Sequence, residues 1–270
     1  MPRTHEDASS GEQNASELKL AQSVFEQYKF HDEYFSTHVF HFTKHHSGEL
    51  PQSNHERFTR DVVHKMLQNS RANDAAVVPM LPHERAVLTH ADTIFQEGFV
   101  GVFGVLPPVS ILDVSHISAG DSSCADRIRR KTYIARRDFD NQYYFLYLAC
   151  HEALHLCFTG FNQVIIEEGL IEMILQDMND LLPDDPLYMP YSSERVYLQY
   201  RDSLQRFFEF TPSLKTVLYR YVIDSDEQLL RRGVGLALGK GSRKRIGVHT
   251  RGADTMMLTA FDRLIAGEEE

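Results

Sequence analysis

The sequence lacks the cysteines that a disulfide framework requires. Its 270 residues include three cysteines, Cys124, Cys150 and Cys157. Cys150 and Cys157 stand seven residues apart on one expected helix, about 10 Å apart along its axis, which is too far for a disulfide bond. Chains without disulfides are typical of reducing compartments, so we expect a cytoplasmic protein.

Long apolar runs are also missing. The first sixteen residues, MPRTHEDASSGEQNAS, have no apolar segment of the kind that a secretory signal carries. No run elsewhere approaches the roughly 18 apolar residues of a membrane-spanning helix. The sequence therefore predicts a cytoplasmic protein with no membrane partner. Secretion without a signal, as by an effector, fits the same composition.

Positive charge is in deficit. The chain has 28 lysines and arginines against 38 aspartates and glutamates, for a formal net charge of −10. Phosphate backbones repel an acidic chain, so we expect no nucleic-acid partner. Apolar residues make up 42% of the chain, which is ordinary for a globular protein with a substantial core. A metal ion would therefore serve chemistry rather than folding.

Three regions are expected along the chain. Residues 1–15 are polar and lack apolar periodicity, so we expect a disordered tail. Residues 16–98 are expected to form a helical N-terminal region, because apolar side chains recur there at helical spacing. Residues 99–270 are expected to hold a catalytic region with a helical C-terminal part. In the N-terminal region, helices are predicted at 16–46, about 54–70 and about 83–98.

After residue 98 the composition changes. β-branched residues predict a strand at 109–114, and alternation predicts a second strand at 131–137, whose charged residues fit an exposed sheet edge. Asp140 is the predicted N-cap of the helix that follows. Further helices are predicted at 140–158, 164–180, 192–210, 213–238 and about 255–266. The predicted fold class is therefore α+β with a dominance of helices.

The predicted helix at 140–158 carries His151-Glu152-Ala-Leu-His155, an H-E-x-x-H motif. Histidines at i and i+4 share one helix face, so both imidazoles can reach one ion. A catalytic zinc site uses three protein ligands and a water. Glu152 is turned by about 100° from His151 and can reach that water rather than the ion. There it can act as general base at neutral pH.

A third ligand must come from another segment. The next predicted helix carries Glu167, Glu168 and Glu172, and after a short turn it could return antiparallel to the first. At this point the sequence resembles the gluzincin zinc metallopeptidases, in which H-E-x-x-H is followed by a glutamate on the next helix. In several branches of that clan the third ligand precedes a glycine, as Glu168 precedes Gly169.

The resemblance covers residues 131–173 and implies a compact, zincin-like member. It implies Glu168 as third ligand, and Glu172, one turn later, as the group that orients a ligating histidine. Glu167 and Glu172 stay open as alternative ligands, and Glu167 could instead be a solvated or salt-bridged side chain. The strand at 131–137 would hold an extended substrate by strand addition.

The function implied by the resemblance is peptide-bond hydrolysis with one zinc ion, acting on a peptide or protein substrate. Zinc would polarise the scissile carbonyl, while Glu152 deprotonates the water and later protonates the leaving amine. The clan usually adds a residue that stabilises the oxyanion. The candidates are Tyr188, Tyr191, Tyr197, Tyr200 and His249.

Other interpretations stay open. The chain could be a zinc-binding regulatory domain without turnover, although a structural site does not need Glu152. It could also be a metal-free helical interaction protein whose core histidines bond to backbone carbonyls. The metzincin pattern fails, because Phe158 and Phe161 stand where it needs glycine and histidine. A deformylase-like cysteine ligand is disfavoured, because Cys124 lacks that family's flanking glycine and leucine.

Overall fold

The structure is a computed structural model that describes residues 65–120, 123–158, 164–182, 195–239 and 253–266. Several expectations lie outside these residues. They are the tail at 1–15, the helix at 16–46, and the candidates Tyr188, Tyr191 and His249. The helix predicted at 54–70 is described from residue 65 and continues to residue 75.

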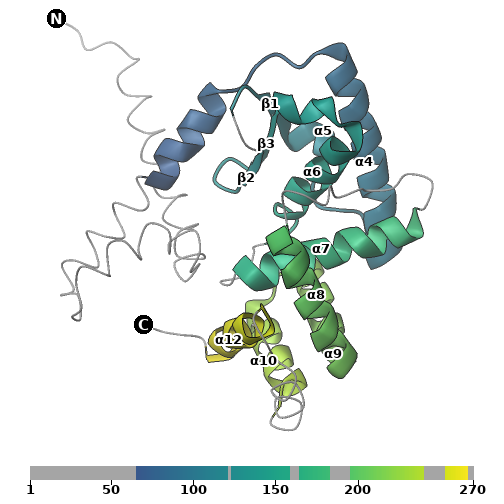
Figure 1. The fold of residues 1–270 in the computed structure, drawn as a ribbon, viewed down its shortest axis with the longest axis vertical. Coiled ribbons are helices and arrows are strands. Elements are labelled where there is room, and N and C mark those ends of the chain that lie inside the picture. The colour runs from purple at the N-terminus through teal and green to yellow at the C-terminus, as the bar shows by residue number, and fades with distance from the viewer. Residues whose placement is uncertain (1–64, 121–122, 159–163, 183–194, 240–252, 267–270) are drawn as a thin grey trace, which may run out of the picture.

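Helices predominate among the described residues, and Figure 1 shows one small sheet near α4, α5 and α6. The helical residues 65–75 are followed by α4 (Pro82–Phe103), α5 (Ile111–Val114), β1 (Ser115–Ser118), β2 (Cys124–Asp126), β3 (Lys131–Ala135), the 3-10 helix η1 (Arg136–Asp140), α6 (Gln142–Leu154), α7 (Val164–Leu181), α8 (Arg195–Phe210), α9 (Pro212–Asp224), α10 (Glu227–Ala237) and α12 (Ala253–Ala266). The predicted fold class, a helix-dominated α+β arrangement with a small sheet beside the histidine-bearing helix, is confirmed.

The start and end of α4 follow from its sequence. Pro82 occupies the first position, where a missing N–H leaves no bond unmade. The buried carboxylate of Glu84 accepts the backbone N–H of Leu81 at 2.6 Å and the Nε–H of Arg136 at 2.6 Å. The helix ends at Gly104, which has a φ of 71°, a conformation that glycine adopts without strain.

The predicted end of this helix at residue 98 was wrong, because Gly98 serves a close helix contact instead of a stop. A Cβ at this position would lie 2.8 Å from Cε of Met178. The missing side chain therefore lets α7 approach α4, and the helix continues to Phe103 with Phe95 and Phe99 buried.

The segment predicted as a strand at 109–114 is also different. Residues 111–114 form the single helical turn α5, and the strand β1 follows at 115–118. A carboxylate oxygen of Asp92 on α4 accepts the N–H of Ile111 at 2.6 Å, and the side chain of Ile111 is buried. This tertiary bond satisfies the first free N–H of the turn, and it outweighs the strand preference of the β-branched residues.

The sheet has the strand order β1-β3-β2, so β3 is its central strand. β1 runs parallel to β3 and β2 runs antiparallel to it. Because β3 is paired on both sides and largely buried, the prediction of an exposed edge at 131–137 was wrong. Its charged ends find partners instead: Lys131 bonds to Asp74, and Arg136, just past the strand, to Glu84.

The two faces of the sheet have different neighbours. Alternate residues of a strand point to opposite faces. Ile117 and Ile134 join the main hydrophobic core, to which α6 also contributes. On the other face, the hydroxyl of Tyr133 donates to Asp74 at 3.2 Å. Asp74 belongs to the helical residues 65–75, so the sheet lies between this helix and the core.

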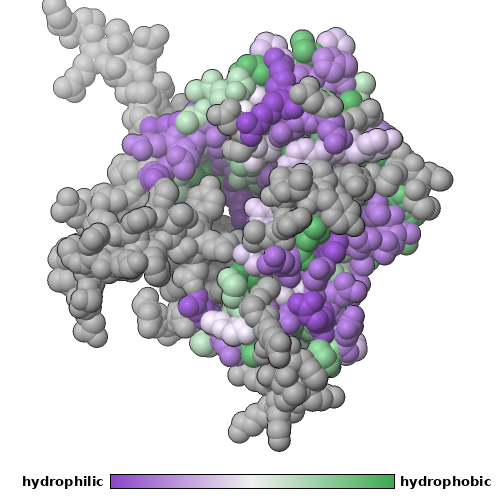
Figure 2. Space-filling model, in the orientation of Figure 1, coloured by the Kyte–Doolittle hydropathy of each residue, from purple (hydrophilic) through white to green (hydrophobic). Residues whose placement is uncertain are grey.

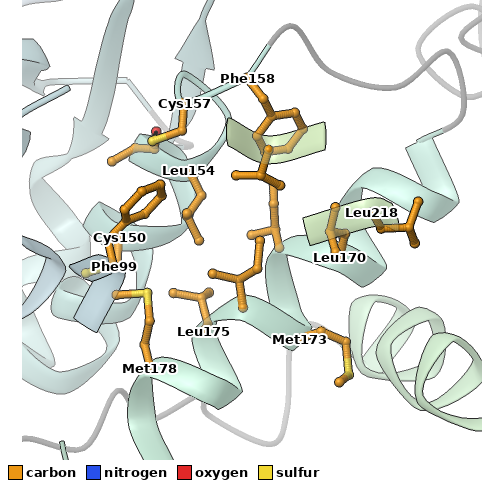
Figure 3. Packing of buried hydrophobic residues seen from close by; sticks show 14 of the residues in the cluster. Phe99, Cys150, Leu154, Cys157, Phe158, Leu170, Met173, Leu175, Met178 and Leu218 are labelled. Atoms are coloured by element: carbon orange, nitrogen blue, oxygen red, sulfur yellow. Dashed lines mark hydrogen bonds between the residues drawn. The ribbon is translucent and has the colours of Figure 1, made fainter. Parts of the chain in front are cut away.

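The helix α7 is central to the described structure. Figure 1 shows it between the part that contains the sheet and the C-terminal helices, and it packs on α4, α6, α8 and α12. In the core drawn in Figure 3, Phe99 of α4 and Leu154 of α6 gather with Leu170, Leu175 and Met178 of α7. This packing sets the H-E-x-x-H helix beside the helix that carries the three glutamates.

Helix boundaries elsewhere differ from prediction where local capping decides them. The predicted helix at 213–238 is broken into α9 and α10 at Ser225, which has a left-handed φ of 50°. The side chain of Asp226 then caps α10 by accepting the N–H of Leu229 at 2.9 Å. At the start of α6 the cap is Asn141 rather than Asp140, which belongs to η1.

No helix in the described part of the chain has the length and apolar character needed to cross a bilayer. On the face of the molecule drawn in Figure 2, hydrophilic residues predominate and hydrophobic ones form small separate patches. Isolated exposed side chains such as Leu106 and Leu236 are ordinary features of a protein surface.

We expect replacement of Glu84 by glutamine to lower the free energy of unfolding by about 1.5–3 kcal/mol at neutral pH, because charge-assisted hydrogen bonds to a buried group are lost. Burial raises the pKa of Glu84, but the hydrogen bonds from Arg136 and Leu81 lower it by a larger amount, so the net shift is downward. The stabilisation is therefore complete above the ordinary glutamate pKa of about 4.3 and is lost as pH falls through the lower folded value.

Urea unfolding, followed by circular dichroism from pH 7 down to about pH 2, measures this difference. The control is Glu97→Gln on the same helix, an exposed position, which should change stability by less than about 0.5 kcal/mol. If the loss of unfolding free energy in Glu84→Gln were the same at every pH, the charge of Glu84 would not be what stabilises the fold.

Candidate metal centre

The helix α6 holds the first motif histidine in an apolar setting. Its buried apolar residues are Phe145, Leu146, Tyr147, Leu148, Ala149, Cys150, Ala153 and Leu154. His151 and Glu152 are buried among them. A polar side chain in such surroundings is costly unless it finds partners, so the partners of these two residues identify what the site is built for.

The second histidine stands at the end of this helix. α6 ends at Leu154 rather than at the predicted residue 158, and His155 is the C-cap. Its φ of −58° and ψ of −23° are still helical, and its N–H donates to the carbonyl of His151 at 3.3 Å. The i, i+4 relation of the two imidazoles is therefore kept, although the regular helix has ended.

The structure brings His151, His155 and Glu168 together. The two Nε2 atoms lie 3.3 Å apart. Oε2 of Glu168 lies 3.3 Å from Nε2 of His151, and Oε1 lies 3.5 Å from Nε2 of His155. Donor atoms held tetrahedrally at about 2.0–2.1 Å from a zinc ion lie roughly 3.3–3.4 Å apart. The three side chains thus form a group that could hold one metal ion.

One oxygen of this group lacks a hydrogen-bond donor among the described residues. Oε2 of Glu168 is buried and accepts no hydrogen bond within the described part of the chain. A buried carboxylate oxygen without a donor is costly. Because this atom faces the histidine nitrogens, a cation between the three side chains would satisfy it.

Glu172 supports His151 from behind. Its Oε1 atom lies 3.0 Å from Nδ1 of His151, and the hydroxyl of Tyr147 donates to the same oxygen. An ionised carboxylate only accepts hydrogen bonds, so Nδ1 donates its proton to Glu172, and Nε2 is the nitrogen that faces Glu168. This is the geometry expected of a metal-ligating histidine.

Glu167 holds the other histidine in the same way. Its Oε1 atom lies 2.6 Å from Nδ1 of His155, and Arg127 forms an ion pair with this oxygen. The side chain of Glu167 is only 2% exposed, so it is salt-bridged but not solvated. Its contact with His155 was not predicted from the sequence. The adjacency of Glu167 and Glu168 could have indicated this contact. Consecutive helical residues point about 100° apart, so two neighbouring glutamates can reach two different histidines.

The charges of the centre reinforce one another. Burial opposes the protonated form of His151, but the adjacent carboxylates of Glu168 and Glu172 outweigh burial and hold the pKa of His151 well above its ordinary value. Burial raises the pKa of Glu168, but His155 and His151 lower it by more, so the net shift is downward. A metal ion and a proton therefore compete for Nε2 of His151.

Glu152 lies outside the three-residue group, on the side of α6 near β2. It is buried, and the structure does not include it among the residues that could hold the ion. Burial, together with the charges of Glu152 and Asp126, raises the pKa of Cys124 on β2 to about 12. Cys124 therefore stays a neutral thiol, and it is not grouped with the histidines either.

Two of the five oxyanion candidates lie within the described residues, both on α8. The ring of Tyr197 lies 5.8 Å from the ring of His151, centroid to centroid. Tyr200 is buried, and its backbone carbonyl packs against Gly169. Of these two, Tyr197 is the one that the structure places against a motif histidine.

Comparisons of this chain with protein-family models, with curated proteins and with solved structures found no match. The likeness to gluzincins therefore depends on the motif itself. What the coordinates support is a buried group of two histidines and one glutamate that could hold a metal ion.

Gly169 fixes the position of Glu168 through a close helix contact. A Cβ at residue 169 would lie 3.0 Å from the backbone oxygen of Tyr200 and 3.1 Å from its carbonyl carbon. Backbone atoms move aside less easily than a flexible side chain, so a larger residue at this position would push α8 away from α7 by a few tenths of an ångström. Helix packing therefore explains the glycine that follows Glu168, independently of any role of Glu168 in binding metal.

We expect Gly169→Ala to lower the free energy of unfolding by about 1–3 kcal/mol, because α8 must shift away from α7. The matched control is Gly235→Ala on α10, where the added Cβ would meet Ile265 at an ordinary 3.7 Å. There the higher helix propensity of alanine should raise stability by up to about 1 kcal/mol. Chemical denaturation measures both, and a gain for Gly169→Ala would contradict the proposed crowding.

Proposed function

We propose that this protein is a zinc-dependent metallopeptidase in which His151, His155 and Glu168 bind the ion and Glu152 is the general base. The observation that carries the proposal is the three-donor group with a buried, unsatisfied Oε2 atom on Glu168. The resemblance of the H-E-x-x-H…E pattern to gluzincins supports the choice of reaction.

The donor set favours zinc. Two neutral imidazoles and one carboxylate, with a free fourth position, are the ligands of many catalytic zinc sites. Calcium and magnesium prefer oxygen ligands throughout. Iron(II) in oxygenases uses the same two histidines and one carboxylate. The position of Glu152 in the H-E-x-x-H motif, directly after the first histidine, favours hydrolysis over oxygen chemistry, because in that motif this carboxylate takes a proton from water.

The buried charges also favour a divalent cation. The carboxylates of Glu152, Glu167, Glu168 and Glu172 are all buried. Arg127 pairs with Glu167. Glu168 and Glu172 lie close to His151. Buried carboxylates need compensating charge, so a divalent cation at Glu168 would stabilise this part of the fold.

The chain's own residues account for the proton transfers of the reaction. A zinc ion in such a site acts as a Lewis acid toward a carbonyl and lowers the pKa of water. Glu152 accepts a proton from the attacking water while the oxygen of that water adds to the carbonyl carbon. The carbon–nitrogen bond then breaks, and Glu152 delivers the proton to the leaving amine.

The sheet geometry changes where a substrate could lie. β3 is paired on both sides and has no edge to offer. β2 is an outer strand of the described sheet, paired to β3 on one side. We therefore assign strand addition of an extended peptide to β2. Tyr197, beside His151, is the candidate for stabilising the oxyanion.

The purified chain is expected to contain one zinc ion per chain, measured by mass spectrometry of the metal content. His151→Ala and Glu168→Ala should lose it, whereas His83→Ala, at an exposed position on α4, should keep it. Zinc at about 100–1,000 times its dissociation constant adds roughly 3–4 kcal/mol to stability. Chelation should therefore lower the melting temperature of the wild type by about 6–16 °C. A wild type without metal, or with iron in place of zinc, would contradict the assignment.

Glu152→Gln is expected to keep zinc and to cleave a peptide library about 10²–10⁴ times more slowly than the wild type, because the base is lost while the ligands remain. Glu209→Gln, an exposed carboxylate on α8, serves as control and should keep full activity. Undiminished cleavage by Glu152→Gln would exclude Glu152 as base. A wild type that binds zinc but cleaves nothing would instead favour a regulatory zinc-binding domain.

A further inference from the structure

The two histidines are fixed by different parts of the chain. His151 lies within α6, one turn after Tyr147, and Glu172 of α7 holds its ring. His155 follows the last helical residue, Leu154. The last carbonyls of a helix have no partner within it, so the position of His155 depends on contacts from outside.

Arg127 supplies those contacts. It stands in the turn between β2 and β3, and its Nε–H donates to the carbonyl of His155 at 2.9 Å. Its Nη2 atom pairs with Oε1 of Glu167, the same oxygen that holds Nδ1 of His155. One guanidinium therefore reaches the backbone of His155 directly and its imidazole through Glu167.

We propose that Arg127 is a positioning residue of the metal centre, which sets the place and the ring orientation of His155. This inference builds on the proposed function, because it assumes that His155 binds the ion. The backbone contact fixes the residue where the helix ladder ends. The pairing with Glu167 keeps that carboxylate in place as the acceptor of the Nδ1 proton, which leaves the Nε2 lone pair for the metal.

The chemistry of the contacts requires an arginine. The planar guanidinium donates in two fixed directions at once, toward a carbonyl and toward a carboxylate. A lysine ammonium carries the charge but cannot reproduce this fork. The positive charge also lies at the C-terminal end of α6, where the helix dipole favours a cation.

The turn that carries Arg127 is held firmly. Its backbone is fixed by the N–H of Arg129, which donates to Oδ1 of Asp126 at 3.1 Å, and by Arg130, which has a left-handed φ of 52°. Arg127 is only partly exposed, at 21% of its side chain. The turn that joins two strands of the sheet therefore presents Arg127 to the candidate metal centre.

Arg129 provides a matched control from the same turn. Its Nε–H donates to Ser70 at 3.0 Å, and its Nη1 atom lies 3.5 Å from Asp74, both on the helical residues 65–75. Removal of Arg129 therefore breaks contacts between the same turn and the helical residues 65–75, and leaves the contacts of Arg127 with His155 and Glu167 in place. Any effect specific to the metal centre should appear on loss of Arg127 and not on loss of Arg129.

The test uses the full chain and compares Arg127→Met, Arg127→Lys and Arg129→Met. Competition with a chromophoric chelator should show zinc binding weakened by about 10–100-fold in Arg127→Met, as expected for loss of an outer-shell partner. Arg127→Lys should recover only part of that loss. Arg129→Met should bind zinc within about twofold of the wild type. The visible spectrum of the cobalt(II)-substituted protein should change in the Arg127 variants alone, because it reports the coordination geometry.

A second readout works without metal. Nitrogen chemical shifts of the imidazoles in the metal-free protein report which ring nitrogen carries the proton. In Arg127→Met the nitrogen shifts of His155 should change, because its Nδ1–H loses a fixed acceptor, whereas those of His151 should stay as in the wild type. If Arg127→Met does not fold, Arg127→Lys carries the same comparison.

The outcomes separate the two proposals. Unchanged zinc affinity, cobalt spectrum and His155 nitrogen shifts in Arg127→Met would overturn the positioning role, even if the wild type is an active peptidase. A wild type that binds no zinc would overturn the metal centre. In that case the nitrogen shifts of His155 in the metal-free variants still decide whether Arg127 positions this ring.

Discussion

The structure depends on holding two imidazoles and one carboxylate close together in a buried place. The Nε2 atoms of His151 and His155 lie 3.3 Å apart, and each lies 3.3–3.5 Å from one oxygen of Glu168. With both Nδ1 atoms directed toward other carboxylates, the facing Nε2 atoms can bind either a proton or a metal ion. Such a group is unfavourable by itself and becomes favourable around a cation. The packing of α6 against α7 supplies the energy that keeps it assembled.

The angular geometry of α7 explains how one helix serves the whole centre. Residues four apart share a helix face, so Glu168 reaches the ligand group while Glu172 reaches the first histidine behind it. Glu167 is turned by about 100° and reaches the second histidine from the other side. Gly169, after Glu168, has no side chain, and α8 packs closely there. Within these six residues, each of the three glutamates and the glycine therefore makes a different contact that its position on the helix determines.

The parts of the centre that the sequence predicted are those set by local helix geometry. The spacing of the motif implied that His151 and His155 face one ion, and the helical spacing of Glu168 and Glu172 implied a shared face. The errors arose where a distant residue decides the local structure. Asp92 converts the expected strand at 109–114 into a helical turn. Arg127 lies 28 residues before His155 and 40 before Glu167, and no local pattern connects them.

The two histidines therefore differ in what holds them. His151 is held within α6 and α7, through Tyr147 and Glu172, and the ring of Tyr197 on α8 lies beside it. His155 also needs the turn between β2 and β3, which reaches it through Arg127. A change in the sheet can then reach the centre through the second histidine while leaving the first in place. Under the role proposed for Arg127, the small sheet helps to build the candidate metal centre, because its turn contacts the histidine that follows the last residue of α6.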